Sequence, residues 1–112
     1  MRKLLTLFAV AALSGVLAAT ALAATKTVTV GDNYFVRDGG VPTVKVKKGT
    51  TVKWVWRGSS PHDVKVKKGP VKFASPVKRS GSYQRKMTRK GTYRIICTIH
   101  GAGDQSMKLV VK

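Results

Sequence analysis

The sequence predicts an all-β domain, and three observations lead to this prediction. Short runs in which apolar and polar residues alternate recur along the chain after Ala23. Turn-forming residues, above all glycine, proline and serine, separate these runs. No stretch after Ala23 has the periodicity of an amphipathic helix. Short alternating strands with turn signals at this spacing indicate an antiparallel sandwich or barrel.

Each alternating run is expected to form one strand with a buried and an exposed face. In the run that contains Val44 and Val46, lysines occupy the intervening positions, and Val52, Trp54 and Trp56 share one face of the next run. We therefore expect valines and tryptophans in the core and lysines in water. The expected strands, in chain order, are 27–30, 43–47, 52–57, 63–67, 82–87, 92–97 and 107–111.

Residues 1–23 have the organisation of a secretory signal peptide. Arg2 and Lys3 precede an uncharged, mostly apolar run, 4–22, and Ala21-Leu22-Ala23 is the small-x-small pattern of a cleavage site. A membrane anchor is the alternative, because the run is nearly long enough to span a bilayer. The cleavage pattern favours removal after Ala23. We expect residues 24–112 to be one exported domain, periplasmic or extracellular, without stable membrane insertion and monomeric.

The chain is strongly basic, with 22 lysines and arginines against 4 aspartates and a formal net charge of +18. Only Arg2 and Lys3 would leave with the signal peptide, so the domain keeps nearly all of this charge. Such a field attracts acidic proteins and anionic surfaces. Aromatic residues are few and no RNA-binding signature is present, so nucleic acid is not the predicted partner.

The single cysteine, Cys97, precedes His100 by three positions, and His62 is the only other histidine. A lone cysteine in an exported chain cannot form an internal disulfide, whereas one thiolate with two imidazoles is the ligand set of a trigonal copper site. Taken singly, such residues are more often ordinary core or surface groups.

Catalysis is not expected. His62 and Asp63 are neighbours that point opposite ways on a strand, and no glutamate is present to activate Cys97 as a nucleophile.

Residues 25–112 closely resemble the cupredoxins, the small blue-copper proteins such as plastocyanin, amicyanin and pseudoazurin. The resemblance rests on the segments 44–54, 61–64 and 80–83, and on the specific string Gly-Thr-Tyr-x-x-x-Cys-x-x-His at 91–100. It implies a single-domain Greek-key β-sandwich of seven or eight strands. It also implies one type 1 copper bound by His62, Cys97 and His100, with the outer nitrogen of His100 near the surface as the electron exit.

The axial position departs from the commonest cupredoxin pattern, in which a methionine follows the second histidine. The plastocyanin spacing, five residues after His100, falls on Gln105, and the amicyanin spacing, three residues after it, falls on Gly103. Gln105 is therefore the predicted axial ligand, as in stellacyanin-like members that use glutamine. An amide oxygen favours Cu(II) over Cu(I), so we expect a lower potential than a methionine ligand gives. Met107 is the rival ligand, or else a core residue of the last strand.

The resemblance implies electron transfer in an outer compartment, with an acidic redox protein as partner and no substrate transformed. A copper carrier or chaperone, which would deliver the ion itself, is the alternative function. A weaker third possibility is a metal-free module that binds an anionic cell surface.

Overall fold

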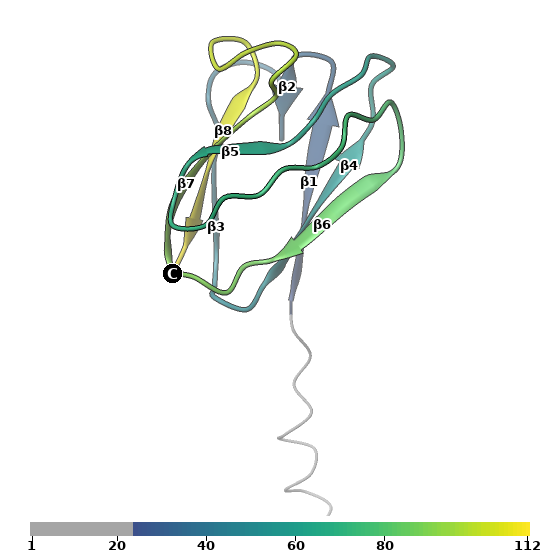
Figure 1. Ribbon diagram of the computed structural model, residues 1–112. Coiled ribbons are helices and arrows are strands. Elements are labelled where there is room, and N and C mark those ends of the chain that lie inside the picture. Colours follow the sequence, from purple (N-terminus) through teal and green to yellow (C-terminus); the bar gives the residue numbers. More distant parts are fainter. Residues whose placement is uncertain (1–23) are drawn as a thin grey trace, which may run out of the picture.

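The computed structural model describes residues 24–112, so the predicted signal peptide and its cleavage lie outside the described residues. Within that range, no helix has the length and apolar character that crossing a membrane requires. Eight strands form two four-stranded sheets that face each other (Figure 1). The predicted β-sandwich of seven or eight strands is therefore confirmed.

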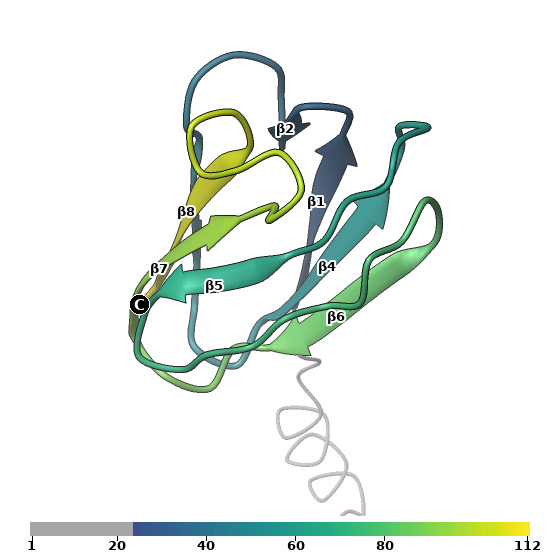
Figure 2. The same ribbon diagram turned by 45° about the horizontal axis from the view of Figure 1, so that its top comes forward.

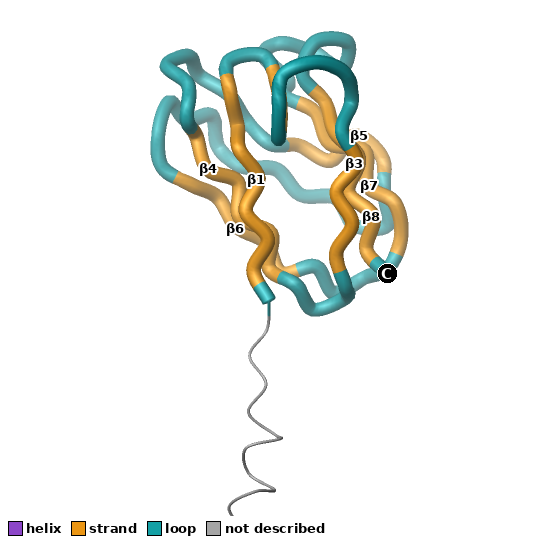
Figure 3. The backbone as a smooth tube through the Cα atoms, turned by 180° about the vertical axis from the view of Figure 1, so that it is seen from behind, coloured by secondary structure: helices purple, strands orange, loops and turns teal. Residues whose placement is uncertain are grey.

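One sheet has the strand order β2-β1-β4-β6 and the other β3-β8-β7-β5, and Figure 3 shows the two layers from behind. Every connection except β1–β2 and β7–β8 passes from one sheet to the other. The strands are β1 Thr25–Gly31, β2 Tyr34–Phe35, β3 Thr43–Val46, β4 Thr51–Trp56, β5 Lys65–Lys68, β6 Ser82–Lys86, β7 Gly91–Ile96 and β8 Ser106–Val111.

The sandwich is not purely antiparallel, which differs from the strand-pattern prediction. β1 pairs with β4 in parallel, and β3 pairs with β8 in parallel. The reason lies in the connections: after the β1–β2 hairpin the chain crosses to the other sheet as β3 and returns to enter β4 from the end where β1 began. No alternating pattern predicted the two-residue strand β2, which in the described chain pairs with Val30 and Gly31.

The core lies between the sheets and follows the predicted alternation. Val44 and Val46 of β3 are buried, as are Val52, Trp54 and Trp56 of β4, while the lysines between the valines are exposed. The aromatic rings of Trp54, Phe73 and Tyr83 pack with centroids 6.0 to 6.3 Å apart. Burial of these side chains supplies most of the driving force for folding, because the described domain contains no disulfide.

Tyr93 joins the core to the turn between β6 and β7. Its ring is fully buried, and its hydroxyl donates a hydrogen bond of 2.8 Å to the carbonyl of Arg89, four residues earlier. Burial raises the pKa of the Tyr93 hydroxyl, so it stays protonated and available as a donor at neutral pH. The bond fixes the chain where it enters β7, the strand that leads to Cys97.

Replacing Tyr93 with phenylalanine should lower the free energy of unfolding by about 0.5–1.5 kcal/mol, because the Arg89 carbonyl loses its partner while the ring remains. Urea unfolding followed by tryptophan fluorescence measures the change. Tyr83→Phe is the matched control, since the Tyr83 hydroxyl makes no hydrogen bond within residues 24–112. Equal effects of the two substitutions would contradict this role for Tyr93.

Candidate metal centre

Three side chains that are distant in sequence meet at one end of the sandwich. His62 lies in the connection after β4, where it forms an isolated bridge with Lys78. Cys97 directly follows β7, and His100 lies three residues further along, in the loop to β8. Figure 2 brings this end forward and shows the β7–β8 loop near the ends of β1 and β4. Because β4 and β7 both end here, the two parts of the site come together.

The donor atoms of these residues lie close enough to share one ion. Cys97 Sγ is 3.8 Å from His62 Nδ1 and 3.5 Å from His100 Nδ1, and all three donors lie within 4.8 Å of one another. Two ligands that are each roughly 2.0–2.3 Å from a common metal are separated by about this much. His62 and Cys97 are fully buried, whereas His100 is partly exposed. The structure therefore brings together all three predicted ligands.

A carboxylate fixes the orientation of His62. Its Nε2 lies 2.9 Å from Asp32 Oδ1, and a carboxylate can only accept, so Nε2 carries the proton. This leaves the lone pair of Nδ1 directed at Cys97. Hydrogen bonding of the outer imidazole nitrogen to a carboxylate is the usual way to hold a histidine ready for a metal.

Asp32 is itself held in place by backbone amides. It occupies the two-residue turn between β1 and β2 and accepts hydrogen bonds of 3.0–3.1 Å from the N–H groups of Ser59 and Ser60. A Cβ at residue 58 would collide with this carboxylate, so Gly58 is required for the approach. The bond from the Ser59 amide, followed by the contact with His62, holds the pKa of Asp32 far below its usual value. Asp32 is therefore ionised at neutral pH and below.

A second carboxylate joins the two ligand segments. Asp63 is buried and accepts hydrogen bonds of 2.7 Å from both the backbone N–H and the hydroxyl of Thr98. Residue 63 follows one ligand and residue 98 follows another, so this pair fixes their separation. Asp63 engages Thr98 while His62 engages Asp32, which agrees with the argument that the two neighbours do not form a catalytic pair.

Gln105 lies beside the ligands, with an unsatisfied oxygen. Its backbone carbonyl accepts from the Cys97 amide, and its side-chain Nε2 donates to the carbonyls of Gly31 and Tyr34 at 3.0 and 2.9 Å. Two carbonyl acceptors identify this atom as nitrogen. The oxygen, Oε1, is fully buried and has no hydrogen-bond partner among residues 24–112. Such a buried acceptor is costly unless something binds it.

Met107 occupies a different kind of position. It pairs with Ile95 in the β7–β8 ladder and is fully buried in the core, on the same face as Leu109 and Val111. This is the location expected of a core residue in the last strand. The choice of axial ligand remains a prediction, and the unsatisfied Oε1 favours Gln105.

One sulfur and two imidazole nitrogens within 4.8 Å of one another form the donor set typical of blue copper, and Gln105 is joined to Cys97 through a backbone hydrogen bond. The unsatisfied Oε1 is the observation that fits the residues to such an ion, because it is a buried acceptor that nothing in the described domain uses. Sequence reasoning missed Asp32 and Gly58. Their only signal was the Gly58-Ser59-Ser60-Pro61 segment, which indicated a turn but no partner.

Comparisons with known proteins agree with this chemistry. Residues 24–112 match the family described as copper binding proteins, plastocyanin/azurin family. Amicyanin-alpha of Methylorubrum extorquens is 38% identical over 63 residues, which are 53% of each chain, so the match spans about half the length of that curated relative.

Solved structures of amicyanin variants have a similar fold. A Cu(I) form with a methionine-to-alanine replacement has a TM-score of 0.66 and 27% identity, over 85% of this chain and 89% of that one. A Cu(I) form with a methionine-to-glutamine replacement has a TM-score of 0.66 and 28% identity over the same shares.

Asp32→Asn should weaken Cu(II) binding by about 10–100-fold, because the amide carries no charge and its NH2 group opposes the amides of Ser59 and Ser60. Competition with a chelator measures the affinity. Asp38→Asn removes the same charge from an exposed carboxylate that makes no hydrogen bond within residues 24–112, and should leave the affinity unchanged. A wild-type affinity for Asp32→Asn would show that His62 does not depend on this contact.

Proposed function

Because the chain belongs to the plastocyanin/azurin family of copper-binding proteins, we propose that it is an exported blue-copper protein that transfers electrons. The proposal places one type 1 copper on His62, Cys97 and His100, with Gln105 as a weak axial ligand. The observation that carries it is the convergence of these donor atoms within 4.8 Å, on a site that hydrogen bonds have already ordered. Bound copper would supply one-electron chemistry by alternating between Cu(II) and Cu(I).

The protein's own contribution is to keep the ligands in one arrangement. Asp32 holds the His62 ring, and Asp63 holds the segment after Cys97. The indole N–H of Trp56 donates to the His62 carbonyl at 3.2 Å and fixes the backbone beside that ring. A site that cannot rearrange loses little energy to reorganisation when the charge on the metal changes. Burial of Cys97 also excludes water and competing thiols.

His100 is the proposed route for electrons, since it is the one partly exposed ligand. The large apolar side chains that are exposed within residues 24–112 are Val41, Val77 and Ile99. Ile99 is the neighbour of His100, Val77 precedes the residue that bridges to His62, and Val41 lines a hollow together with Asp104 of the ligand loop. Apolar groups around an exposed ligand suit brief contact with a redox partner.

We propose an acidic redox protein as that partner. Arg57, Lys78 and Arg79 belong to segments beside His62, and they would attract acidic groups toward the metal end. Transfer between two redox proteins transforms no substrate, so no enzymatic role is proposed. We also propose that the chain is cleaved after Ala23 and that residues 24–112 are released as one monomeric domain. Its location would be periplasmic or extracellular.

Adding Cu(II) to the apo-protein should produce the intense visible band of a thiolate–copper bond and a narrow-hyperfine resonance signal, and Cys97→Ser should abolish both.

Gln105→Met should shift the band and raise the reduction potential, because thioether sulfur stabilises Cu(I) relative to an amide oxygen. Met107→Leu is the control and should change stability only. If only Met107→Leu alters the copper spectrum, Gln105 is not the axial ligand.

Electron transfer and copper delivery predict different behaviour on mixing. The reduced and oxidised forms should exchange electrons rapidly and keep their copper in the presence of an apo-acceptor such as a chelating peptide. Stopped-flow absorbance of the thiolate–copper band separates the two processes. Rapid loss of copper from both oxidation states, together with slow electron exchange, would favour the carrier function instead.

A further inference from the structure

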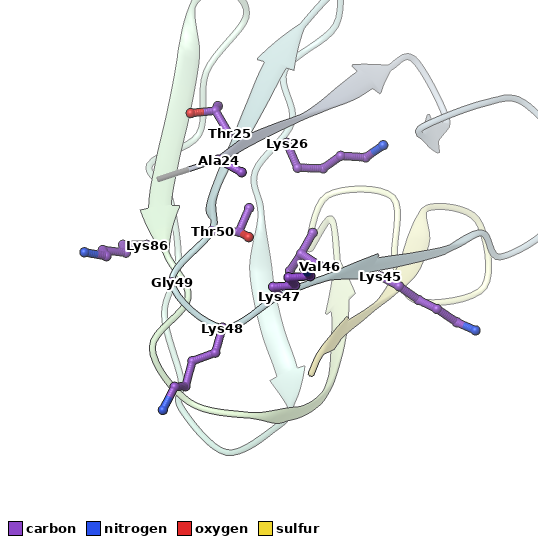
Figure 4. A pocket seen from close by; sticks show the side chains of 10 residues that line it. All are labelled: Ala24, Thr25, Lys26, Lys45, Val46, Lys47, Lys48, Gly49, Thr50 and Lys86. Atoms are coloured by element: carbon purple, nitrogen blue, oxygen red, sulfur yellow. The ribbon is translucent and has the colours of Figure 1, made fainter. Parts of the chain in front are cut away.

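A hollow of about 620 Å³ lies at one end of the sandwich, between the first residues of β1 and the last residues of β3 (Figure 4). Its wall includes Val46 and the turn at Gly49. Five lysines line it, and we call them the lysine end: Lys26, Lys45, Lys47, Lys48 and Lys86.

The lysine end is opposite the metal end. Lys86 pairs with Thr51, where β4 begins, whereas His62 lies in the connection that follows the other end of β4. Likewise Val46 pairs with Val111 at the end of β8, whereas the ligand loop precedes the start of that strand. The length of the strands therefore separates the hollow from the metal site.

The acidic residues are confined to the metal end. Asp32 and Asp63 hydrogen-bond to His62 and to Thr98, Asp104 lies in the ligand loop, and Asp38 lines a hollow with Asp104. These are all four acids of the chain. Cations such as Arg57 and Arg79 balance them there, while no acidic side chain lines the hollow at the lysine end.

The lysine end is available to a partner. All five side chains are exposed, and no lysine or arginine within residues 24–112 forms an ion pair. In Figure 4 the side chains of Lys45, Lys48 and Lys86 point in different directions away from the hollow. Ammonium groups spread in this way match an extended anionic surface better than they match one small anion.

The place where the predicted signal peptide joins the domain favours a membrane as this anionic surface. Ala24 lines the hollow, so the apolar run 4–22 ends immediately before the lysine end. A segment of that character enters a membrane during export. The lysine end is therefore the part of the domain that is joined directly to the segment predicted to enter the membrane.

We propose that the lysine end docks on the anionic headgroups of a lipid membrane, with the metal end facing away. Basic residues near such a surface each strengthen binding by about fivefold. The charge asymmetry sets the orientation, because the lysine end carries no aspartate, whereas at the metal end aspartates offset the cations. Docked in this way, the protein leaves His100 free for a soluble partner.

Lysines on edge strands such as β3 and β6 also have a simpler role, because charge there prevents pairing with another strand. A charge at any position along an edge strand is enough to protect that edge. Docking requires that the charges gather at one end of the molecule. Binding to lipid therefore distinguishes the two roles.

The test uses the chain without residues 1–23, whose two sheets and core lie wholly within the described residues. Co-sedimentation compares vesicles of mixed phosphatidylglycerol and phosphatidylcholine with vesicles of phosphatidylcholine alone. The protein should bind only the anionic vesicles, and more weakly as salt rises. Replacing the five lysines of the lysine end with glutamine should reduce binding by at least about a hundredfold.

A matched control variant has five lysines from elsewhere on the surface changed to glutamine and should keep most of the binding. These lysines are Lys53, Lys65, Lys67, Lys72 and Lys108. Circular dichroism verifies that both variants are folded. Equal loss in the two variants would overturn the proposal, because net charge alone would then account for binding. Lysine-end-dependent binding to polyglutamate without binding to vesicles would also overturn it, in favour of an acidic protein. The test needs no metal, so it stands apart from the copper proposal.

Discussion

The candidate metal site depends on the turn between β1 and β2. From this one turn, the Asp32 carboxylate reaches His62, and the carbonyls of Gly31 and Tyr34 hold the amide of Gln105. A donor and a predicted axial ligand are thus oriented by the same four residues, although neither is near them in sequence. The ring of Tyr34 lies where a Cβ of Gly31 would stand, so only glycine allows the turn to close in this way. Hydrogen bonds of this kind order the ligands within the protein itself, and the metal need not rearrange them.

The sandwich makes this arrangement possible because strands from both sheets finish at the same end. β1 and β4 belong to one sheet and β7 to the other, and the segments after them supply Asp32, His62 and Cys97. Side chains from two rigid layers can meet there without a long flexible loop. The buried carboxylate of Asp63 then joins the layers through Thr98. Burial of this charge is acceptable because both of its oxygens accept hydrogen bonds. The fold is therefore rigid where the ligands are, and it exposes only His100 and the apolar side chains around it.

Charge is distributed along the same axis as the chemistry. The four aspartates of the chain serve or surround the metal end, where Asp32 and Asp63 position ligand segments. The lysines of the hollow lie at the other end and contact no acid within the described residues. Because the aspartates are confined to one end, the two ends differ in charge, and this difference can orient the molecule on a charged surface. Copper chemistry and surface attachment can then occupy separate ends without interfering with each other.

The sequence by itself determined the all-β class, the faces of the strands and the three candidate donors. Alternation of valine with lysine is a local pattern, and a lone cysteine with two histidines leaves few other metal chemistries. The roles of Asp32, Gly58 and Asp63 could not be predicted, because each depends on a contact between segments about 30 residues apart. The parallel pairings likewise depend on segments distant in sequence, and the two-residue strand β2 is too short to show an alternating pattern. Gln105 lies between these cases: its spacing made it a candidate ligand, but only the tertiary structure shows that its amide nitrogen is held and its oxygen is left without a partner. Local patterns record which residues are buried, whereas the orientation of a ligand is set by whatever the fold places on its other side.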